Sequence, residues 1–262
     1  MQIKSEKIYD YELSIVLPSG YNTENKYRTI YMHDGGNGGV QVLNYIDHLI
    51  ISQQIEPFII VGIVPNDRNN EYTPWEAPSL LPNVPPLGGK AKEYLNDVVN
   101  KIKPYIDDNY STNPAPSHTA ISGCSFGGLV SIFASYYYPD VFHHYIILSA
   151  SFWYDGVLQY IQGEEVIRKS ISYKKPVINR ENHQMYLYVG KMEGIYRESI
   201  QKNMVDFTEK AYKELLQEGF KTENILFEQH LEGTHDAYFF SMHFLRGLQW
   251  LYGNKANNRI SF

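Results

Sequence analysis

The chain has 262 residues and a formal net charge of −6, and this length is enough for one large domain with a substantial buried core. The absence of a basic face argues against nucleic-acid binding, and no apolar run approaches the roughly 20 residues that span a bilayer. The single cysteine, Cys124, excludes an intramolecular disulfide and a cysteine-based zinc site. Because the N-terminus also lacks a basic-then-apolar leader, we expect a cytoplasmic protein with one domain over residues 1–262.

Strands and helices alternate along the chain. The first predicted strands are residues 11–18 and 29–32, and the second of these runs into the glycine-rich stretch HDGGNGG. The run EPFIIVGIVPN is typical of a strand that is covered on both faces. Later predicted strands are SHTAISG, HHYIILSAS, QMYLYVG and NILFEQHLEG, and later predicted helices are GGLVSIFASYYY, residues 196–218 and AYFFSMHFLRGLQWLYG. This alternation predicts an α/β fold, with a mostly parallel sheet and helices on both faces.

Two segments between these elements have distinctive patterns. Apolar residues at helical spacing predict a helix between residues 95 and 106, which we expect Pro104 to bend or shorten. The stretch from Asp67 to Gly89 is rich in Pro, Asn and Gly and contains Trp75. Long loops of this kind in compact domains are often functional, so we expect it to lie near a binding site.

Ser125 lies in the sequence Gly-Cys-Ser-Phe-Gly, between a predicted strand and a predicted helix. This is the context of a nucleophile elbow, in which Gly123 and Gly127 allow strand and helix to approach across a sharp turn. The alternative is that Ser125 is only a helix cap. We predict that it is a nucleophile, and that Cys124 points away from the cleft as a small buried side chain.

A serine nucleophile needs a general base, for which His235 is the predicted residue. It lies in the loop HLEGTHDAYFF, between the last predicted strand and the last predicted helix. His33, in the loop after residues 29–32, is predicted either to contact substrate or to support the site from behind. We expect surface or structural roles for the remaining histidines, which are His48, His118, His143, His144, His183, His230 and His243.

An acidic side chain should orient the imidazole of the base. Glu193 follows the predicted strand QMYLYVG and precedes Gly194, which allows the loop to turn inward. Asp206 is expected on the solvated face of a helix, and Asp236 is adjacent to His235 with the wrong geometry. We therefore predict Glu193 as the acid, while a Ser–His dyad or an acid from elsewhere remains an alternative.

Acyl transfer also needs donors for the oxyanion of the tetrahedral intermediate. The predicted donors are the backbone N–H groups of Phe126 and of Gly36, in the HDGGNGG loop. Phosphate binding is the alternative for this loop, but it lacks the Lys-Ser/Thr of a P-loop and the pattern G-x-G-x-x-G. We expect no metal and no cofactor.

These segments resemble the putative esterase (esterase D-like) family of α/β-hydrolases, and within it the enterochelin esterases. The similarity is carried by YMHDGGNGG, DRNNEYTPWEAPS, SGCSFGGLVSIFASYYYPDVFHHYIILSASFWYDG and EGTHDAYFF, which together span most of the chain. The resemblance implies an α/β-hydrolase fold and hydrolysis of siderophore trilactones. The family also contains simple carboxylesterases, S-formylglutathione hydrolases and acyltransferases, so these activities remain alternatives.

From the residues and the resemblance together, we expect a serine esterase that acts on a small-molecule ester. The predicted substrate-contacting residues are Arg68, Trp75, Trp153 and His33, with Phe152 and Tyr154 beside them. Core packing is the alternative for the aromatic residues, and a brace to Glu71 or Glu76 is the alternative for Arg68. A non-catalytic siderophore binder on the same fold is the remaining possibility.

Overall fold

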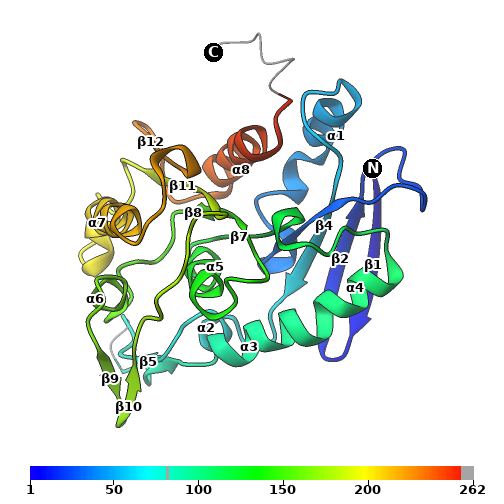
Figure 1. The fold of residues 1–262 in the computed structure, drawn as a ribbon. Helices are drawn as coiled ribbons and strands as arrows, with labels where there is room; N and C mark the ends of the chain where they lie inside the picture. The colour runs from blue at the N-terminus through cyan, green and yellow to red at the C-terminus, as the bar shows by residue number, and fades with distance from the viewer. Residues whose placement is uncertain (81–82, 255–262) are drawn as a thin grey trace.

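A computed structural model describes residues 1–80 and 83–254, and its centre is an eight-stranded sheet (Figure 1). The order across the sheet is β1-β2-β4-β3-β7-β8-β11-β12, in which β1 pairs antiparallel with β2 and β2 antiparallel with β4. All later neighbours are parallel. The strands are β1 (Gln2–Ile8), β2 (Tyr11–Leu17), β3 (Arg28–Met32), β4 (Phe58–Val64), β7 (Thr119–Cys124), β8 (His144–Leu148), β11 (Gln184–Gly190) and β12 (Ile225–His230). The predicted mostly parallel sheet is therefore confirmed.

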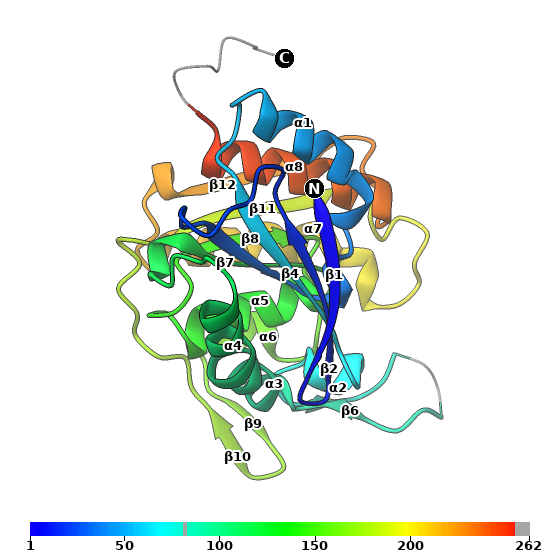
Figure 2. The same cartoon turned by 90° about the vertical axis from the view of Figure 1, so that its right-hand side faces the viewer.

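Helices cover both faces of this sheet (Figure 2). One face carries α1 (Leu43–Ile51) and α8 (Ala237–Tyr252), whose buried side chains share a core with one side of the central strands. The other face carries α3 (Ala91–Asp97), α4 (Lys103–Asn109), α5 (Phe126–Tyr137), α6 (Val157–Ile161) and α7 (Met204–Gln217). No helix in the described part of the chain is long and apolar enough to cross a membrane.

The burial of α5 and α7 follows from their sequences. In α5, ten consecutive residues from Gly127 to Tyr136 are buried, because the helix is apolar or small on all sides and is covered by α3 and α6 as well as the sheet. In α7, the buried residues Met204, Thr208, Ala211 and Leu215 recur at intervals of three and four, which places them on one face. The central helix α5 is therefore buried on all sides, whereas the surface helix α7 is buried on one face only.

Three features of the predicted secondary structure need correction. The strand β1 was not expected, because QIKSEKI is mostly polar and exposed, yet its backbone pairs along its whole length with β2. The helix expected over residues 196–218 begins only at Met204, after a 3-10 turn over Ile200–Asn203. Pro104 does not end the helix expected between residues 95 and 106, because Ile102 and Lys103 keep helical dihedral angles and the chain runs from a π-helix over Val98–Ile102 directly into α4.

The long segment after β4 is more structured than its composition suggests. It contains the short helix α2 (Arg68–Glu71) and the strand pair β5 (Glu76–Ala77) and β6 (Leu87–Gly88). A second small hairpin, β9 (Val166–Arg168) and β10 (Ile171–Tyr173), projects from the same end of the molecule (Figure 1). An ion pair between Lys169 and Glu76 joins this hairpin to the long segment.

Candidate active site

Ser125 occupies the sharp turn between β7 and α5. Its backbone has φ 58° and ψ −120°, a conformation that L-residues adopt only where the surrounding structure holds them. The turn needs glycine at position 123, because a Cβ there would lie 2.5 Å from the backbone carbon and oxygen of Gly127. The predicted strand–turn–helix geometry is thus present, with the serine at its apex.

The amino end of α5 begins at this serine. The first N–H groups of a helix have no intrahelical acceptor, and they point toward the position of a group held at its N-terminus. Phe126 is the first residue of α5, so its N–H is available beside Ser125. Cys124 is buried, as predicted, and burial raises the pKa of its thiol.

Glu193 and His235, the predicted acid and base, lie on the loops that follow β11 and β12. His235 Nδ1 and Glu193 Oε2 are 2.7 Å apart, and the Glu193 side chain is fully buried while that of His235 is 34% exposed. The other carboxylate oxygen accepts hydrogen bonds from the hydroxyl of Ser149 and from the N–H of Gly190. Both oxygens of Glu193 are therefore held, and the imidazole is oriented by one of them.

The loops that carry the acid and the base are joined through their backbones. The N–H groups of Lys191 and Met192 donate to the carbonyl oxygens of His230 and Gly233, each at 2.9 Å. A Cβ on Gly190 would lie 2.3 Å from the carbonyl oxygen of Gly233, which allows no side chain there. The close approach of these glycines is what brings Glu193 and His235 together.

Ser125 is linked to this pair through the carboxyl end of β8. The Ser151 N–H donates to the Ser125 carbonyl oxygen at 3.2 Å, and the two hydroxyl oxygens are 3.3 Å apart. Two residues earlier, Ser149 contacts Glu193. Within the described residues, no hydrogen bond joins Ser125 Oγ to His235, so a direct contact between them stays a prediction. Catalytic hydrogen bonds are often long before substrate binds.

The glycine-rich loop after β3 forms the other side of the site. A Cβ on Gly62 of β4 would lie 2.3 Å from the Gly35 carbonyl oxygen, so this glycine lets the loop pack onto the sheet. The N–H of Gly36, the predicted oxyanion donor, donates instead to the His33 carbonyl oxygen at 3.1 Å. In this conformation the Gly36 N–H closes a turn, and its role as an oxyanion donor stays a prediction.

Arg68 lies in α2, at the edge of the site, and forms an ion pair that the sequence did not indicate. Its guanidinium binds both carboxylate oxygens of Asp34, at 2.7 and 2.9 Å, and lies over the rings of Tyr72 and Phe126. The expected alternatives, Glu71 and Glu76, have other partners. The Arg68 side chain is 38% exposed and is therefore accessible to a ligand, but its charge is already paired with that of Asp34.

His33 and Trp75 are both buried, which agrees with the supporting role left open for His33 and with core packing, the alternative for Trp75, and not with direct contact to substrate. His33 Nδ1 lies 2.8 Å from the Tyr94 hydroxyl, and burial together with the charge of Arg68 lowers the pKa of His33 to about 3, so the ring is neutral. Trp75 is 0% exposed and donates to the Asp155 carbonyl oxygen at 2.7 Å. Neither side chain reaches the surface of the site, so their roles are in the core.

The aromatic residues that follow β8 differ in how deeply they are buried. Phe152 and Tyr154 are almost fully buried, which matches the core-packing alternative. Trp153 is only partly buried, and its ring lies 5.6 Å from that of Phe126. Trp153 and Phe126 are therefore the aromatic side chains placed to line a binding surface beside Ser125.

The sequence interpretation did not assign roles to Ser149 and Ser151. Both are buried, and Ser149 has φ 46°. The available signal was the polar pair in LSAS at the carboxyl end of an otherwise apolar strand, where active-site groups gather in parallel sheets. Across residues 1–80 and 83–254, no group of three or more His, Cys, Asp or Glu side chains is placed to hold a metal ion.

Comparisons with known proteins give a matching family and several structures of similar fold. The family model for the putative esterases matches residues 8–251. The protein YbbA of Bacillus subtilis is 28% identical over 256 residues, covering 97% of this chain and 98% of YbbA. An IroE-like serine hydrolase from Shewanella oneidensis superposes with a TM-score of 0.75 at 21% identity, over 96% of this chain and 80% of that one. The enterobactin esterase FES of Shigella flexneri gives 0.70 at 18% identity, over 96% of this chain and 59% of FES.

Proposed function

Because this chain belongs to the putative esterase family and is a carboxylic ester hydrolase with an α/β-hydrolase fold, we propose that it cleaves esters through a serine acyl-enzyme. The observation that carries this proposal is the pairing of His235 with the buried carboxylate of Glu193, on loops adjacent to the strained turn at Ser125. An imidazole oriented in this way is the arrangement that activates a serine hydroxyl.

In the proposed mechanism, Ser125 Oγ attacks the ester carbonyl while His235 Nε2 accepts its proton. The Nδ1–H of His235 donates to Glu193, which stabilises the imidazolium without taking its proton. The alcohol then leaves with the proton from Nε2, and an acyl-enzyme remains on Ser125. Water, deprotonated by His235, attacks this acyl group, and the proton returns to Ser125 as the acid leaves.

The negative charge on the tetrahedral oxygen needs two donors. Phe126 supplies the first through the N–H at the start of α5. The loop Asp34–Gly36 supplies the second, and Gly36 does so when its N–H exchanges the His33 carbonyl, at 3.1 Å, for the oxyanion. The charge that develops in the transition state is a stronger acceptor than a neutral carbonyl, which favours this exchange.

For the substrate, we propose a siderophore-type trilactone first. Support comes from similar proteins, which include the Shigella flexneri enterobactin esterase and a siderophore enterobactin esterase of Emericella nidulans that is 26% identical over 166 residues. Phe126 and Trp153 would face an aryl arm. A simple neutral ester is the second candidate, because Arg68 is already paired with Asp34 and so contributes little net positive charge.

The proposal is tested by labelling with a fluorophosphonate probe and by a substrate panel. We expect the probe to modify Ser125, identified by peptide mass, and pre-incubation with a hydrolysable ester to slow labelling. The panel contains p-nitrophenyl acetate, S-formylglutathione and a catecholate trilactone, with the trilactone expected to have the highest kcat/KM. Saturable trilactone binding without labelling or turnover would instead indicate a non-catalytic binder, and product transfer to added alcohol in preference to water would indicate an acyltransferase.

A further prediction concerns Ser149, which positions Glu193. Replacing Ser149 with alanine removes a donor to a buried carboxylate, and hydrogen bonds to charged groups contribute about 1.5–3 kcal/mol. We expect kcat for p-nitrophenyl acetate to fall about 10- to 100-fold with little change in KM. The control is Ser135→Ala, since Ser135 is equally buried and its hydroxyl has no partner within the described residues. Full activity in Ser149→Ala would remove Ser149 from the site.

A further inference from the structure

The three residues of the proposed oxyanion loop, Asp34–Gly36, all have positive φ, at 54°, 68° and 92°. Glycine adopts this region of backbone space without a steric penalty, but Asp34 carries a Cβ and does so only where its neighbours hold it. The conformation of the loop, and with it the place of the proposed Gly36 donor, therefore depends on the contacts of Asp34.

Those contacts come from the segment around α2. The Asp34 N–H donates to the Tyr72 hydroxyl at 2.9 Å, and the Asp34 carboxylate accepts two hydrogen bonds from the Arg68 guanidinium, at 2.7 and 2.9 Å. Arg68 is the first residue of α2, and Tyr72, which is 0% exposed, directly follows its last residue. The backbone and the side chain of Asp34 are thus both held by one short segment.

The α2 segment is itself fixed to its neighbours in the fold. The side-chain oxygen of Asn70 accepts a hydrogen bond from the Gly88 N–H at 2.7 Å, and the Asn70 carbonyl oxygen accepts one from the Lys90 N–H at 2.9 Å, just before α3. Asp34 is therefore bound to a braced part of the structure, from which Arg68 can set the position of the loop.

The Arg68–Asp34 ion pair also lies between the loop and the first turn of α5, which is beside α2 (Figure 1). Arg68 Cζ is 5.8 Å from the ring centroid of Phe126, the residue that supplies the other proposed oxyanion donor. Asp34 Oδ2 lies 3.4 Å from the point that a Cβ on Gly127 would occupy. The pair therefore touches both halves of the proposed oxyanion hole and fixes the separation between them.

The charges of the pair matter at this place as well. An unpaired carboxylate beside the nucleophile turn would oppose the negative charge that develops on the tetrahedral intermediate, and the Arg68 guanidinium neutralises it. Two parallel hydrogen bonds also fix the orientation of the carboxylate, which the single ammonium of a lysine would not do. Arg68 thus compensates the charge of Asp34 and sets its orientation at the same time.

We propose that Asp34 and Arg68 are positioning residues of the oxyanion hole. Arg68 acts on the reaction by holding Asp34, and through it the loop of the second donor, at the distance from Phe126 that the tetrahedral intermediate requires. This inference rests on the proposed serine esterase function and adds two residues that act without touching the substrate. It predicts that loss of the pair weakens binding of the transition state and leaves binding of the ester itself nearly unchanged.

The test measures kcat and KM for p-nitrophenyl acetate, together with inhibition by phenylboronic acid, whose boron adds to a serine oxygen as a tetrahedral anion and so occupies the oxyanion hole. Asp34→Asn breaks the ion pair, while asparagine still tolerates the positive φ. Because a displacement of about 1 Å in a catalytic group costs roughly 100-fold in rate, we expect kcat to fall about 10- to 100-fold and KM to change less than about twofold. Affinity for phenylboronic acid should fall by a factor similar to that of kcat.

Three further variants separate the charge of the pair from its geometry. Arg68→Met leaves the Asp34 carboxylate unpaired, so its kcat should fall at least as far as that of Asp34→Asn. Adding Asp34→Asn to Arg68→Met should cause no further loss, because residues that act as one unit are not additive and the unpaired charge is then gone. Arg68→Lys should stay well below wild type, since lysine restores the charge without the two parallel hydrogen bonds.

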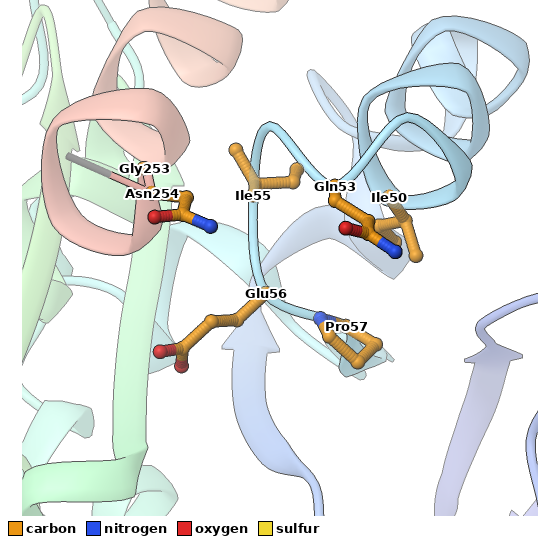
Figure 3. A pocket seen from close by; sticks show the side chains of 7 residues that line it. All are labelled: Ile50, Gln53, Ile55, Glu56, Pro57, Gly253 and Asn254. Atoms are coloured by element: carbon orange, nitrogen blue, oxygen red, sulfur yellow. The ribbon is translucent and has the colours of Figure 1, made fainter. Parts of the chain in front are cut away.

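The matched control is an arginine–carboxylate pair at the other end of β3. Arg28, the first residue of β3, donates to Glu56 at 2.7 Å, before β4 begins. Glu56 is one of the residues that line an open pocket at the amino edge of the sheet (Figure 3), whereas active sites in parallel sheets lie at the carboxyl edge. Glu56→Gln should therefore leave both kcat and the inhibition by phenylboronic acid unchanged.

Unchanged kcat in Asp34→Asn would overturn the proposal, as would independent losses that multiply in the double variant. A direct role of Arg68 in substrate binding would also overturn it. An anionic ester, mono-p-nitrophenyl succinate, would then show a lower KM in Asp34→Asn, where the guanidinium is released, and a higher KM with unchanged kcat in Arg68→Met.

Ser125→Ala, assayed in parallel, separates failure of this inference from failure of the proposed function. Parental turnover in Ser125→Ala would overturn the proposed function together with this inference. Loss of turnover in Ser125→Ala with full kcat in Asp34→Asn would overturn this inference alone.

Discussion

Replacing Ser125 with alanine is expected to lower kcat/KM for p-nitrophenyl acetate by about 10⁴- to 10⁶-fold. In serine hydrolases the nucleophile and its base act as one unit, so loss of either removes nearly all turnover. The thermal unfolding midpoint should change little, because alanine fits the same space and keeps the positive φ of the turn. Initial rates over a range of substrate concentrations give kcat/KM, and calorimetry gives the unfolding midpoint.

The matched control is Ser151→Ala, which removes the hydroxyl that lies 3.3 Å from Ser125 Oγ. We expect this variant to keep its activity within about tenfold of wild type, because the substitution removes a hydroxyl beside Ser125 Oγ and leaves the attacking oxygen in place. A larger loss of activity in Ser151→Ala than in Ser125→Ala would show that Ser125 is not the nucleophile. Hydrolysis at the parental rate by Ser125→Ala would end the serine mechanism altogether.

Part of the candidate site was predictable from the sequence, because its residues follow the ends of strands in the order of the chain. Ser125, Glu193 and His235 each follow a strand of the parallel sheet, whose carboxyl ends share one edge. The predicted contact between the acid and the base is present at 2.7 Å. Local sequence was sufficient here because turn glycines and strand patterns fix where these loops begin.

The rest depended on contacts between distant segments. Arg68 pairs with Asp34, which is 34 positions away in the chain and separated from it by α1 and β4. Trp75 lies among residues that read as a loop, yet α5 and α6 bury it completely through Phe133 and Tyr160. No spacing rule reveals such partners, because they are set by how the helices pack onto the sheet.

The orientation of a single amide was also beyond the sequence. HDGGNGG correctly placed a glycine-rich loop next to the nucleophile turn, and Gly62 explains how the loop fits against β4. Whether the Gly36 N–H points into the site depends on a rotation that glycine permits in either sense. The edge strand β1 shows the same limit, since its pairing with β2 uses backbone groups that carry no side-chain signal.

Substituting alanine at Gly190 should separate the acid from the base. The added Cβ would meet the Gly233 backbone at 2.3–2.8 Å, and backbone atoms cannot rotate away as a flexible side chain would. The two loops must therefore move apart, and a displacement of about 1 Å in a catalytic group costs roughly 100-fold in rate. We expect kcat to fall by at least that factor, with about 1–3 kcal/mol of stability lost through overpacking.

The control is Gly219→Ala, in the turn after α7, where a Cβ would meet no atom within 4 Å but φ is +103°. Both variants are expected to lose stability, because Gly190→Ala forces the two loops apart and Gly219→Ala places a side chain at a positive φ. Only Gly190→Ala should also lower kcat. We also expect wild type to show a strongly downfield Nδ1 proton in its proton NMR spectrum from the His235–Glu193 hydrogen bond, and this signal should disappear only in Gly190→Ala. Retention of both the signal and full kcat would show that these loops do not depend on the glycine contact. The alignment of the acid with the base would then have to come from Ser149 and the rest of the Glu193 environment.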